Sequence, residues 1–356
     1  MDQLQIILKE KNYRINIGTS LIKNMRSFYP LKFGDKVMLL TDSNVCYLWK
    51  NSLVKKLNFL GISVDECIVP CGEQHKNMQV VEEVISKLIQ KNYTRDSVLI
   101  ALGGGVIGDL TGFIASIYQR GIRYIQIPTT LLAQVDASIG GKTAVNHSLA
   151  KNMIGSFWHP EIVIIDLDFL KTLPNKELIS GMAEVVKYAV AFDVRFFKWL
   201  ENNYNNLLKL DNSTMLHCIY ECCKMKVNIV IQDEQEQNVR TLLNLGHSYG
   251  HAIESFTKYT KWSHGEAVSA GIVMAANASL LLDSISQDDV SRIISLLKNI
   301  GLPIKGPQEM TWKSYLKYMK RDKKNISENF LRLVLLKRLG QANIYDEISY
   351  NVVKKS

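Results

Sequence analysis

The chain has 356 residues, 47% of them hydrophobic and 22% charged, so it is long enough for two domains with separate cores and is not a disordered protein. No apolar run approaches the length that crosses a bilayer, and the first residues, MDQLQIILKEKN, lack the apolar segment of a secretory signal, so we expect a cytoplasmic protein with no membrane partner. The net charge of +9 comes from scattered Lys and Arg residues, which argues against a nucleic-acid partner.

The first half of the chain alternates strand and helix patterns. Residues 5–18 read as two short strands around a polar turn. Further strands are predicted at residues 36–40, 62–69, 97–102 and 122–127, with helices at residues 45–60 and 78–90. This alternation predicts a Rossmann-like, largely parallel sheet with helices on its faces, which binds ligands at the carboxyl ends of its strands.

A glycine motif, GGGVIG at residues 103–108, directly follows the strand predicted at residues 97–102 and opens an apolar helical run. It matches G-x-G-x-x-G, in which backbone amides and a helix N-terminus approach a pyrophosphate. The acidic residue expected about twenty positions later is missing, so Asp42, after the earlier strand, is the best candidate to bind a ribose. The alternative is a glycine turn that only packs a helix on the sheet.

The segment AQVDASIGGKTAVN, residues 133–146, has the composition of a loop that lines a ligand. Asp136, Lys142 and Asn146 stand there among small residues, and Lys151 and Asn152 extend the polar lining. A merely solvated loop is the alternative. Such loops seldom carry so many small and apolar neighbours, so the composition favours a site.

Helical patterns replace strand patterns in the second half of the chain. They cover residues 175–190, 213–232, 241–256, 266–282 and 290–300. We therefore expect an α/β domain at residues 1–168 and a mostly α-helical domain at residues 169–356. A cleft between the two domains is the expected place of the active site.

Histidines in the helical half suggest a metal site. His247 and His251 stand four apart and leave the same face of a helix, and His264 opens a run of small residues that can pack closely against that helix. Glu184 stands among apolar and small residues, three before Lys187, where a carboxylate needs a cation or a proton. Three protein ligands would leave an open position on a catalytic zinc ion. The alternative is a histidine pair that only fills core or surface.

Seven motifs, taken together, resemble the 3-dehydroquinate synthase family of the shikimate pathway. In chain order they are GGGVIGDLTGFIAS, YQRGIRYIQIPTTLLAQVDASIGGKTAVN, KNMIGSFWHP, GMAEVVKYA, RTLLNLGHSYGHAIE, HGEAV and MKRDKKN. The resemblance spans essentially the whole chain. It implies an NAD- and zinc- or cobalt-dependent lyase that converts 3-deoxy-arabino-heptulosonate 7-phosphate, a small anionic sugar phosphate, into 3-dehydroquinate and phosphate. Transient oxidation by NAD, phosphate elimination, reduction, ring opening and an internal aldol closure would follow one another.

The resemblance also implies roles for individual residues. The metal ligands would be Glu184, His247 and His264, so His251 would be a neighbour of the metal and not a ligand. The residues that contact NAD would be Asp42, Asn44, Glu73, Lys76, Gly104, Gly105, Val106, Asp109, Thr129, Thr130, Lys142 and Lys151. The catalytic residues would be Asp136, Lys142, Lys187, Glu236 and His251. The substrate-binding residues would be Arg120, Asn152, Lys226, Arg240, Asn244 and Lys324. Arg120 matches a residue that reaches a neighbouring subunit's site, so a homodimer with one metal ion per subunit is implied.

Other interpretations of these residues stay open at the level of sequence. Glu236 and Arg240, four apart, fit an ordinary salt bridge within a helix, and Asp109 fits a residue stabilised by a helix dipole. The stretch after Lys323 and Lys324 lacks the glycine common in the family, so either lysine fits the substrate role. The same fold also serves other sugar-phosphate cyclases and metal-dependent polyol dehydrogenases, which are the alternative functions.

Overall fold

The computed structural model describes residues 1–9, 11–320 and 330–356, and the chain packs into two compact units. The first unit consists of residues 1–174 and 215–235, and the second of residues 175–214 and 236–356. Residues 215–235 hold most of helix α6 (Asn212–Gln232), so the chain returns to the first unit after it has begun the second. Our expectation of two continuous domains did not include this return.

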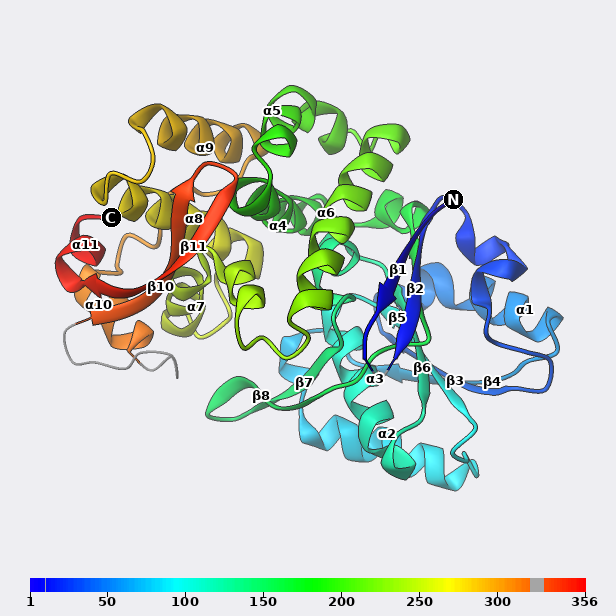
Figure 1. Cartoon of the computed structure of the whole chain (residues 1–356). Helices are drawn as coiled ribbons and strands as arrows, with labels where there is room; N and C mark the ends of the chain where they lie inside the picture. The colour runs from blue at the N-terminus through cyan, green and yellow to red at the C-terminus, as the bar shows by residue number, and fades with distance from the viewer. Residues whose placement is uncertain (10, 321–329) are drawn as a thin grey trace. The chain divides into compact units, whose positions relative to one another are not determined.

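A seven-stranded sheet forms the centre of the first unit, in the order β1-β2-β9-β6-β5-β3-β4 (Figure 1). Its strands are β1 (Asp2–Ile7), β2 (Asn12–Gly18), β3 (Lys36–Asp42), β4 (Ser63–Val69), β5 (Val98–Gly103), β6 (Arg123–Pro128) and β9 (Ile162–Asp166). β1 pairs with β2 in antiparallel orientation, and all other neighbours in this sheet are parallel. The predicted Rossmann-like sheet is confirmed.

Helices cover both faces of this sheet because its strands carry apolar side chains on both sides. Met38 and Leu40 of β3 belong to a core with α2 (Met78–Gln90) and α3 (Gly105–Ile117). Val37 and Leu39 point the other way, into a core with α1 (Asn51–Phe59). A strand buried on both faces reads as a continuous apolar run, which is why these strands could be predicted.

The prediction of a loop at residues 133–146 is wrong for most of these residues. A π-helical turn (Ala133–Ala137) is followed by an antiparallel hairpin of β7 (Lys142–His147) and β8 (Ala150–Phe157). In β7 the buried residues Thr143 and Val145 alternate with more exposed neighbours. This alternation is too short, and too close to two glycines, to stand out in the sequence.

The second unit is mostly helical, as predicted. Its helices are α4 (Asn175–Phe192), α5 (Val194–Leu208), α7 (His247–Phe256), α8 (His264–Leu281), α9 (Gln287–Ile300), α10 (Trp312–Met319) and α11 (Tyr350–Lys355). An antiparallel hairpin of β10 (Phe330–Arg338) and β11 (Gln341–Ser349), not predicted, completes it. In the described part of the chain, no helix is both long and apolar enough to cross a membrane.

The prediction of one helix over residues 241–256 is wrong for the residues before His247. A 3₁₀-helix (Val239–Asn244) comes first, Gly246 adopts φ +78°, and α7 begins only at His247. A Cβ atom on Gly246 would lie 2.7 Å from the backbone nitrogen of Ile272, so the turn needs glycine for space as well as for conformation. The break places His247 in the first turn of α7.

Candidate metal and cofactor sites

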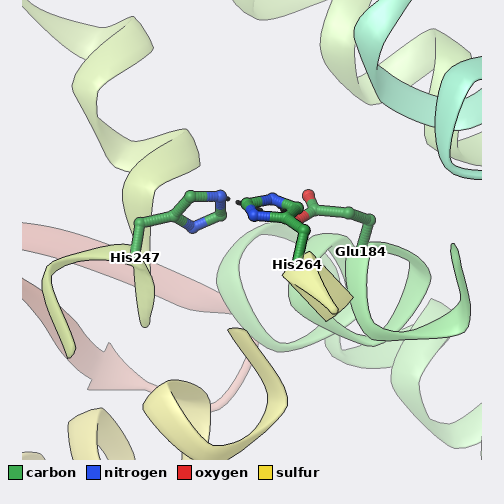
Figure 2. Close-up of side chains that lie close together, drawn as sticks. All are labelled: Glu184, His247 and His264. Carbon is green, nitrogen blue, oxygen red and sulfur yellow. Dashed lines mark ion pairs between the residues drawn. The ribbon is translucent and has the colours of Figure 1, made fainter. Parts of the chain in front are cut away.

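Glu184, His247 and His264 converge in the second unit (Figure 2). Glu184 lies within α4, while His247 and His264 are the first residues of α7 and α8. The Nε2 atoms of His247 and His264 lie 3.4 Å and 3.6 Å from Oε1 of Glu184, and one ligand atom from each residue lies within 4.8 Å of the others. One carboxylate and two imidazoles are a donor set for zinc that leaves a coordination position open.

Glycines allow the three helices to approach closely enough to form this group. A Cβ atom on Gly265 would lie 2.0 Å from the carbonyl oxygen of Ser180 on α4, and one on Gly271 would lie 2.1 Å from the carbonyl oxygen of Gly246. Neither position has room for a side chain unless the backbone moves. The predicted close packing of the small-residue helix that His264 opens is confirmed, and it brings the two histidines together.

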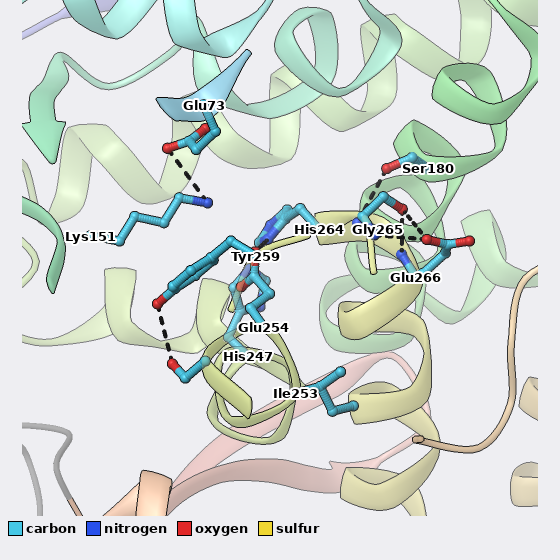
Figure 3. A network of polar contacts seen from close by, with 12 residues as sticks. Glu73, Lys151, Ser180, His247, Ile253, Glu254, Tyr259, His264, Gly265 and Glu266 are labelled. Atoms are coloured by element: carbon cyan, nitrogen blue, oxygen red, sulfur yellow. Dashed lines mark hydrogen bonds and ion pairs between the residues drawn. The ribbon is translucent and has the colours of Figure 1, made fainter. Parts of the chain in front are cut away.

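Hydrogen-bond partners orient both imidazole rings. Nδ1 of His247 lies 3.2 Å from the carbonyl oxygen of Leu245, and Nδ1 of His264 lies 3.3 Å from Oε1 of Glu254 (Figure 3). A proton on each Nδ1 satisfies these contacts and leaves Nε2 of each ring as the atom that faces Glu184 and would bind a metal ion. Histidines that bind metals generally donate their other ring N–H in this way. The residues present therefore fit a divalent metal ion.

The two histidines differ in charge when no metal is bound. Burial, against the attraction of Glu184, lowers the pKa of His247 to about 3. Burial alone would lower the pKa of His264 too, but hydrogen bonds to Glu184 and Glu254 raise it to about 10. His247 would thus bind a metal as a neutral ring without losing a proton, whereas His264 would first release the proton from its Nε2.

Lys187 and His251 lie next to this group. Lys187 forms an ion pair with Glu184 one turn away on α4, and both side chains are almost fully buried. The ring centroid of His251 lies 5.5 Å from that of His247 and 6.4 Å from that of His264. The group of ligand atoms close enough to share an ion contains His264 and not His251. This geometry agrees with the role of a neighbour that the family resemblance gave to His251.

In the first unit, several predicted cofactor residues follow the carboxyl ends of neighbouring parallel strands. Asp42 ends β3, Glu73 follows β4, Gly104 follows β5, and Thr129 and Thr130 follow β6. Since these strands are adjacent and parallel, the residues share one edge of the sheet. That is the edge where such sheets bind ligands.

The glycine motif packs a helix on the sheet, and its partly exposed part stays a candidate for cofactor binding. A Cβ atom on Gly103 would lie 2.7 Å from Ile107, and one on Gly108 would lie 2.3 Å from Gln126, so these two glycines pack α3 on the sheet. Gly104 and the residues through Val106 form the partly exposed start of α3. The amides of this start are available to an anion, as in a dinucleotide site.

Lys76 connects two other cofactor candidates. Its Nζ, nearly buried, lies 2.5 Å from Oδ2 of Asp109 and donates to Oδ1 of Asn152 at 2.6 Å. Burial raises the pKa of Asp109, and the ammonium of Lys76 opposes this rise. Asp109 lies in the second turn of α3, so this ion pair, more than the helix dipole, accounts for its position.

The same polar network continues into the hairpin of β7 and β8. The backbone N–H of Asn152 donates to Oδ1 of Asn146 at 2.9 Å, and Nδ2 of Asn146 donates to Oε1 of Glu73 at 2.8 Å. Lys151 lies 3.7 Å from the same Glu73 oxygen (Figure 3). Asn146, Lys151 and Asn152 therefore form one connected group with Glu73 and Lys76, although their segment is a hairpin and not a loop.

Two pairs of predicted substrate and catalytic residues are also in contact. In the first unit, Nζ of Lys226 donates to the backbone oxygen and to Oδ1 of Asp136, at 2.6 Å and 2.8 Å. In the second unit, Nδ2 of Asn244 donates to Oε1 of Glu236 at 2.9 Å. Glu236 has φ +58° and lies outside any helix, so the interpretation of Glu236 and Arg240 as a pair within one helix is wrong.

The remaining predicted residues are more dispersed. Oδ1 of Asp42 accepts hydrogen bonds from the amides of Asn44 and Val45 at 2.8 Å and 3.0 Å, which shapes the turn after β3. Arg120, in the turn after α3, and Lys142, at the start of β7, are exposed. Lys323 and Lys324 lie outside the described residues.

Comparisons with known proteins agree on one family. The family models described as 3-dehydroquinate synthase N-terminal and C-terminal match residues 66–180 and 181–325. A 3-dehydroquinate synthase from Buchnera aphidicola subsp. Baizongia pistaciae (strain Bp) is 54% identical over 346 residues, which is 97% of either chain.

Two solved structures are similar over nearly the whole chain at 25% identity. One is a 2-epi-5-epi-valiolone synthase from Streptomyces hygroscopicus subsp. jinggangensis 5008 with NAD+ and Zn2+ bound, with a TM-score of 0.90 over 98% of this chain and 96% of that one. The other is a 2-deoxy-scyllo-inosose synthase complexed with carbaglucose-6-phosphate, NAD+ and Co2+, with a TM-score of 0.91 over 99% of this chain and 98% of that one.

Proposed function

Because the chain belongs to the 3-dehydroquinate synthase family, we propose that it converts 3-deoxy-arabino-heptulosonate 7-phosphate into 3-dehydroquinate and phosphate, as a lyase of aromatic biosynthesis. The single observation that carries this proposal is the 54% identity to a 3-dehydroquinate synthase over 97% of the chain. The group of Glu184, His247 and His264 supports it independently, since the reaction calls for a divalent metal.

The cofactors of this reaction are NAD and one Zn²⁺ or Co²⁺ ion per subunit. Two similar sugar-phosphate cyclases hold NAD+ together with Zn2+ or Co2+, which supports the same pair here. When bound, NAD removes a hydride from the substrate and later returns it, and the metal ion polarises substrate oxygens. Glu184, His247 and His264 would hold the metal, and the residues at the carboxyl edge of the sheet would hold NAD.

The substrate has two anionic ends, and the chain offers cations for each. Lys226 and Arg240 would bind the carboxylate, for which a guanidinium gives paired hydrogen bonds. The phosphate would be bound by Lys142, Asn152, Lys324 and Arg120. Lys226 already has Asp136 as a partner, so the substrate carboxylate would share or displace that contact.

The residues with catalytic roles would mainly position the substrate and stabilise its charges. Lys187 and His251, beside the metal ligands, would donate hydrogen bonds to substrate oxygens. Asp136 would hold Lys226, and Glu236 would hold Asn244, through the hydrogen bonds that these pairs form in the structure. Partly buried partners of this kind help to keep a charged or amide group in one orientation.

The enzyme would act as a homodimer in the cytoplasm. Arg120 is exposed in the turn after α3, where it can reach a second subunit, and it matches a residue that does so in the family. An interface of this kind makes each site depend on both copies of the chain.

The test is phosphate release from the heptulosonate phosphate, measured with and without NAD and before and after removal of metal by a chelator. We expect release to require both NAD and metal, with no net growth of NADH absorbance because the hydride returns to the substrate. Steady accumulation of NADH would indicate a polyol dehydrogenase instead. No release, from protein that still binds NAD and zinc, would indicate another sugar-phosphate cyclase.

A further inference from the structure

Glu254 is a buried carboxylate beside the metal ligands for which the family resemblance gave no role. Its side chain is almost fully buried, and its Oε1 lies 3.3 Å from Nδ1 of His264 (Figure 3). It lies seven residues after His247 on α7, on the same face as His247 and His251, so helical spacing alone could have identified it. A carboxylate at this depth needs a cation or a hydrogen-bond donor.

The two imidazole ligands have different partners on their Nδ1 atoms. Nδ1 of His247 faces the backbone carbonyl of Leu245. This acceptor is uncharged, and because it belongs to the backbone, a substitution at Leu245 does not remove it. His264 faces a carboxylate that comes from a different helix. Hydrogen bonds to an ionised acceptor are about twice as strong as neutral ones, so the ring of His264 is the more firmly held and the more basic ligand.

The position of His264 makes such a partner necessary. His264 is the first residue of α8, and about 30% of its side chain is exposed, compared with 11% for His247. Packing therefore restrains the His264 ring less than the His247 ring, and its hydrogen bond must supply the remaining orientation.

We propose that Glu254 is a positioning residue, which accepts the Nδ1 proton of His264, fixes the tautomer whose Nε2 binds the metal, and so sets the metal affinity of the site. This inference rests on the proposed metal site of Glu184, His247 and His264. It assigns to Glu254 no contact with substrate.

The experiment measures the binding of Zn²⁺ and Co²⁺ to metal-free protein by competition with a chelator, together with the visible spectrum of the Co²⁺ form. Glu254→Gln keeps an acceptor but removes its charge, and we expect about tenfold weaker binding; Glu254→Ala removes the acceptor, and we expect about 100-fold weaker binding. The Co²⁺ spectrum should change in both variants, because the ligand field depends on the basicity and orientation of the ring.

Glu266→Gln is the matched control. Glu266 lies two residues after His264, and its carboxylate accepts from Ser263 at the start of α8 and not from the imidazole. Gln also serves at this capping position, so the control should bind metal within about twofold of the unchanged protein. Thermal unfolding of the metal-free variants shows whether each is folded.

The measurements distinguish a failure of the positioning role of Glu254 from a failure of the proposed metal site. Wild-type affinity and an unchanged Co²⁺ spectrum in both Glu254 variants would overturn the positioning role, and so would an equal loss in Glu266→Gln. An unchanged protein that binds neither Zn²⁺ nor Co²⁺ would instead overturn the proposed metal site itself.

Discussion

At the scale of single residues, Glu184 combines a buried ion pair with Lys187 and a proposed role as a metal ligand. Both side chains are almost fully buried, and the carboxylate faces the ammonium on one side and two imidazoles on the other. Removal of one member of a buried pair leaves an uncompensated charge, which costs more than the pair contributes. Changes at these positions therefore affect stability and metal binding together, and an experiment has to separate the two effects.

We expect Glu184→Ala to abolish metal retention, and turnover with it, while NAD binding stays largely intact. The variant should also lose about 3–5 kcal/mol of unfolding free energy, because the buried ammonium of Lys187 loses this partner. Atomic absorption measures the metal content, and urea unfolding measures the stability. Metal content equal to that of the unchanged protein would show that the proposed ligand set is wrong.

The double variant Glu184→Ala/Lys187→Met is the control for this prediction. An apolar side chain in place of the ammonium should restore most of the lost stability, since buried ion pairs can be replaced by apolar residues at little cost. Metal should remain absent. Recovery of stability without recovery of metal would show that Glu184 binds the metal directly and does not act only through the fold.

At the scale of elements, the sequence predicted what depends on local pattern and missed what depends on distant neighbours. Strands such as β3 and β5 were predictable because continuous burial produces a continuous apolar run. The hairpin of β7 and β8 was missed because many of its residues are polar and two glycines stand directly before β7. The break at Gly246 was missed because its cause, the backbone of α8, is remote in the sequence.

In the candidate site, too, local spacing could be predicted from the sequence, whereas contacts between distant residues could not. The spacing of His247 and His251 suggested a metal site from one helix, but the convergence of His264 with Glu184 depends on how three helices pack. Only the family resemblance indicated that His264, and not His251, completes the group. Glu254 was not predicted because its partner, His264, lies on another helix, so their contact depends on how α7 and α8 pack.

Close contact between α4 and α8 gives a prediction at this scale. Gly265→Ala would place a methyl group 2.0 Å from the carbonyl oxygen of Ser180, so the backbones of the two helices must separate. We expect a loss of about 1–3 kcal/mol in unfolding free energy, the usual cost of overpacking. Metal affinity should fall as well, since Gly265 directly follows His264. Urea unfolding and chelator competition measure these two effects.

Gly18→Ala is the comparison for this variant. A Cβ atom there would meet its nearest neighbour at 3.4 Å, which is ordinary contact distance, and Gly18 belongs to the other compact unit. Its metal affinity should equal that of the unchanged protein. If both alanine variants lowered the affinity to the same extent, close helix packing would not be the reason.

At the scale of the whole molecule, the proposed dimer makes a prediction about mixtures of inactive variants. Arg120→Ala would lack the cation supplied to the neighbouring site, and Glu184→Ala would lack the metal of its own site. In a mixed dimer, the subunit with intact Glu184 receives an intact Arg120 from its partner. Random exchange should therefore restore about a quarter of the wild-type activity, since half of the dimers are mixed and each has one complete site.

Phosphate release measured before and after subunit exchange tests this prediction. Each variant should be nearly inactive alone, and activity should appear only after exchange. Sustained inactivity of the mixture, under conditions where exchange is verified by labelled subunits, would show that Arg120 does not act across subunits.

The return of residues 215–235 to the first unit has a consequence for how the protein is made. Cys218, Cys222 and Cys223 of α6 are buried, and Sγ of Cys223 donates to the carbonyl oxygen of Gln134 in the same unit. A ribosome that has synthesised only residues 1–174 has therefore not yet made the helix that contacts Gln134 and completes the first unit. The first unit can be finished only after residue 235 has emerged, so the two units mature in overlapping order and not one after the other.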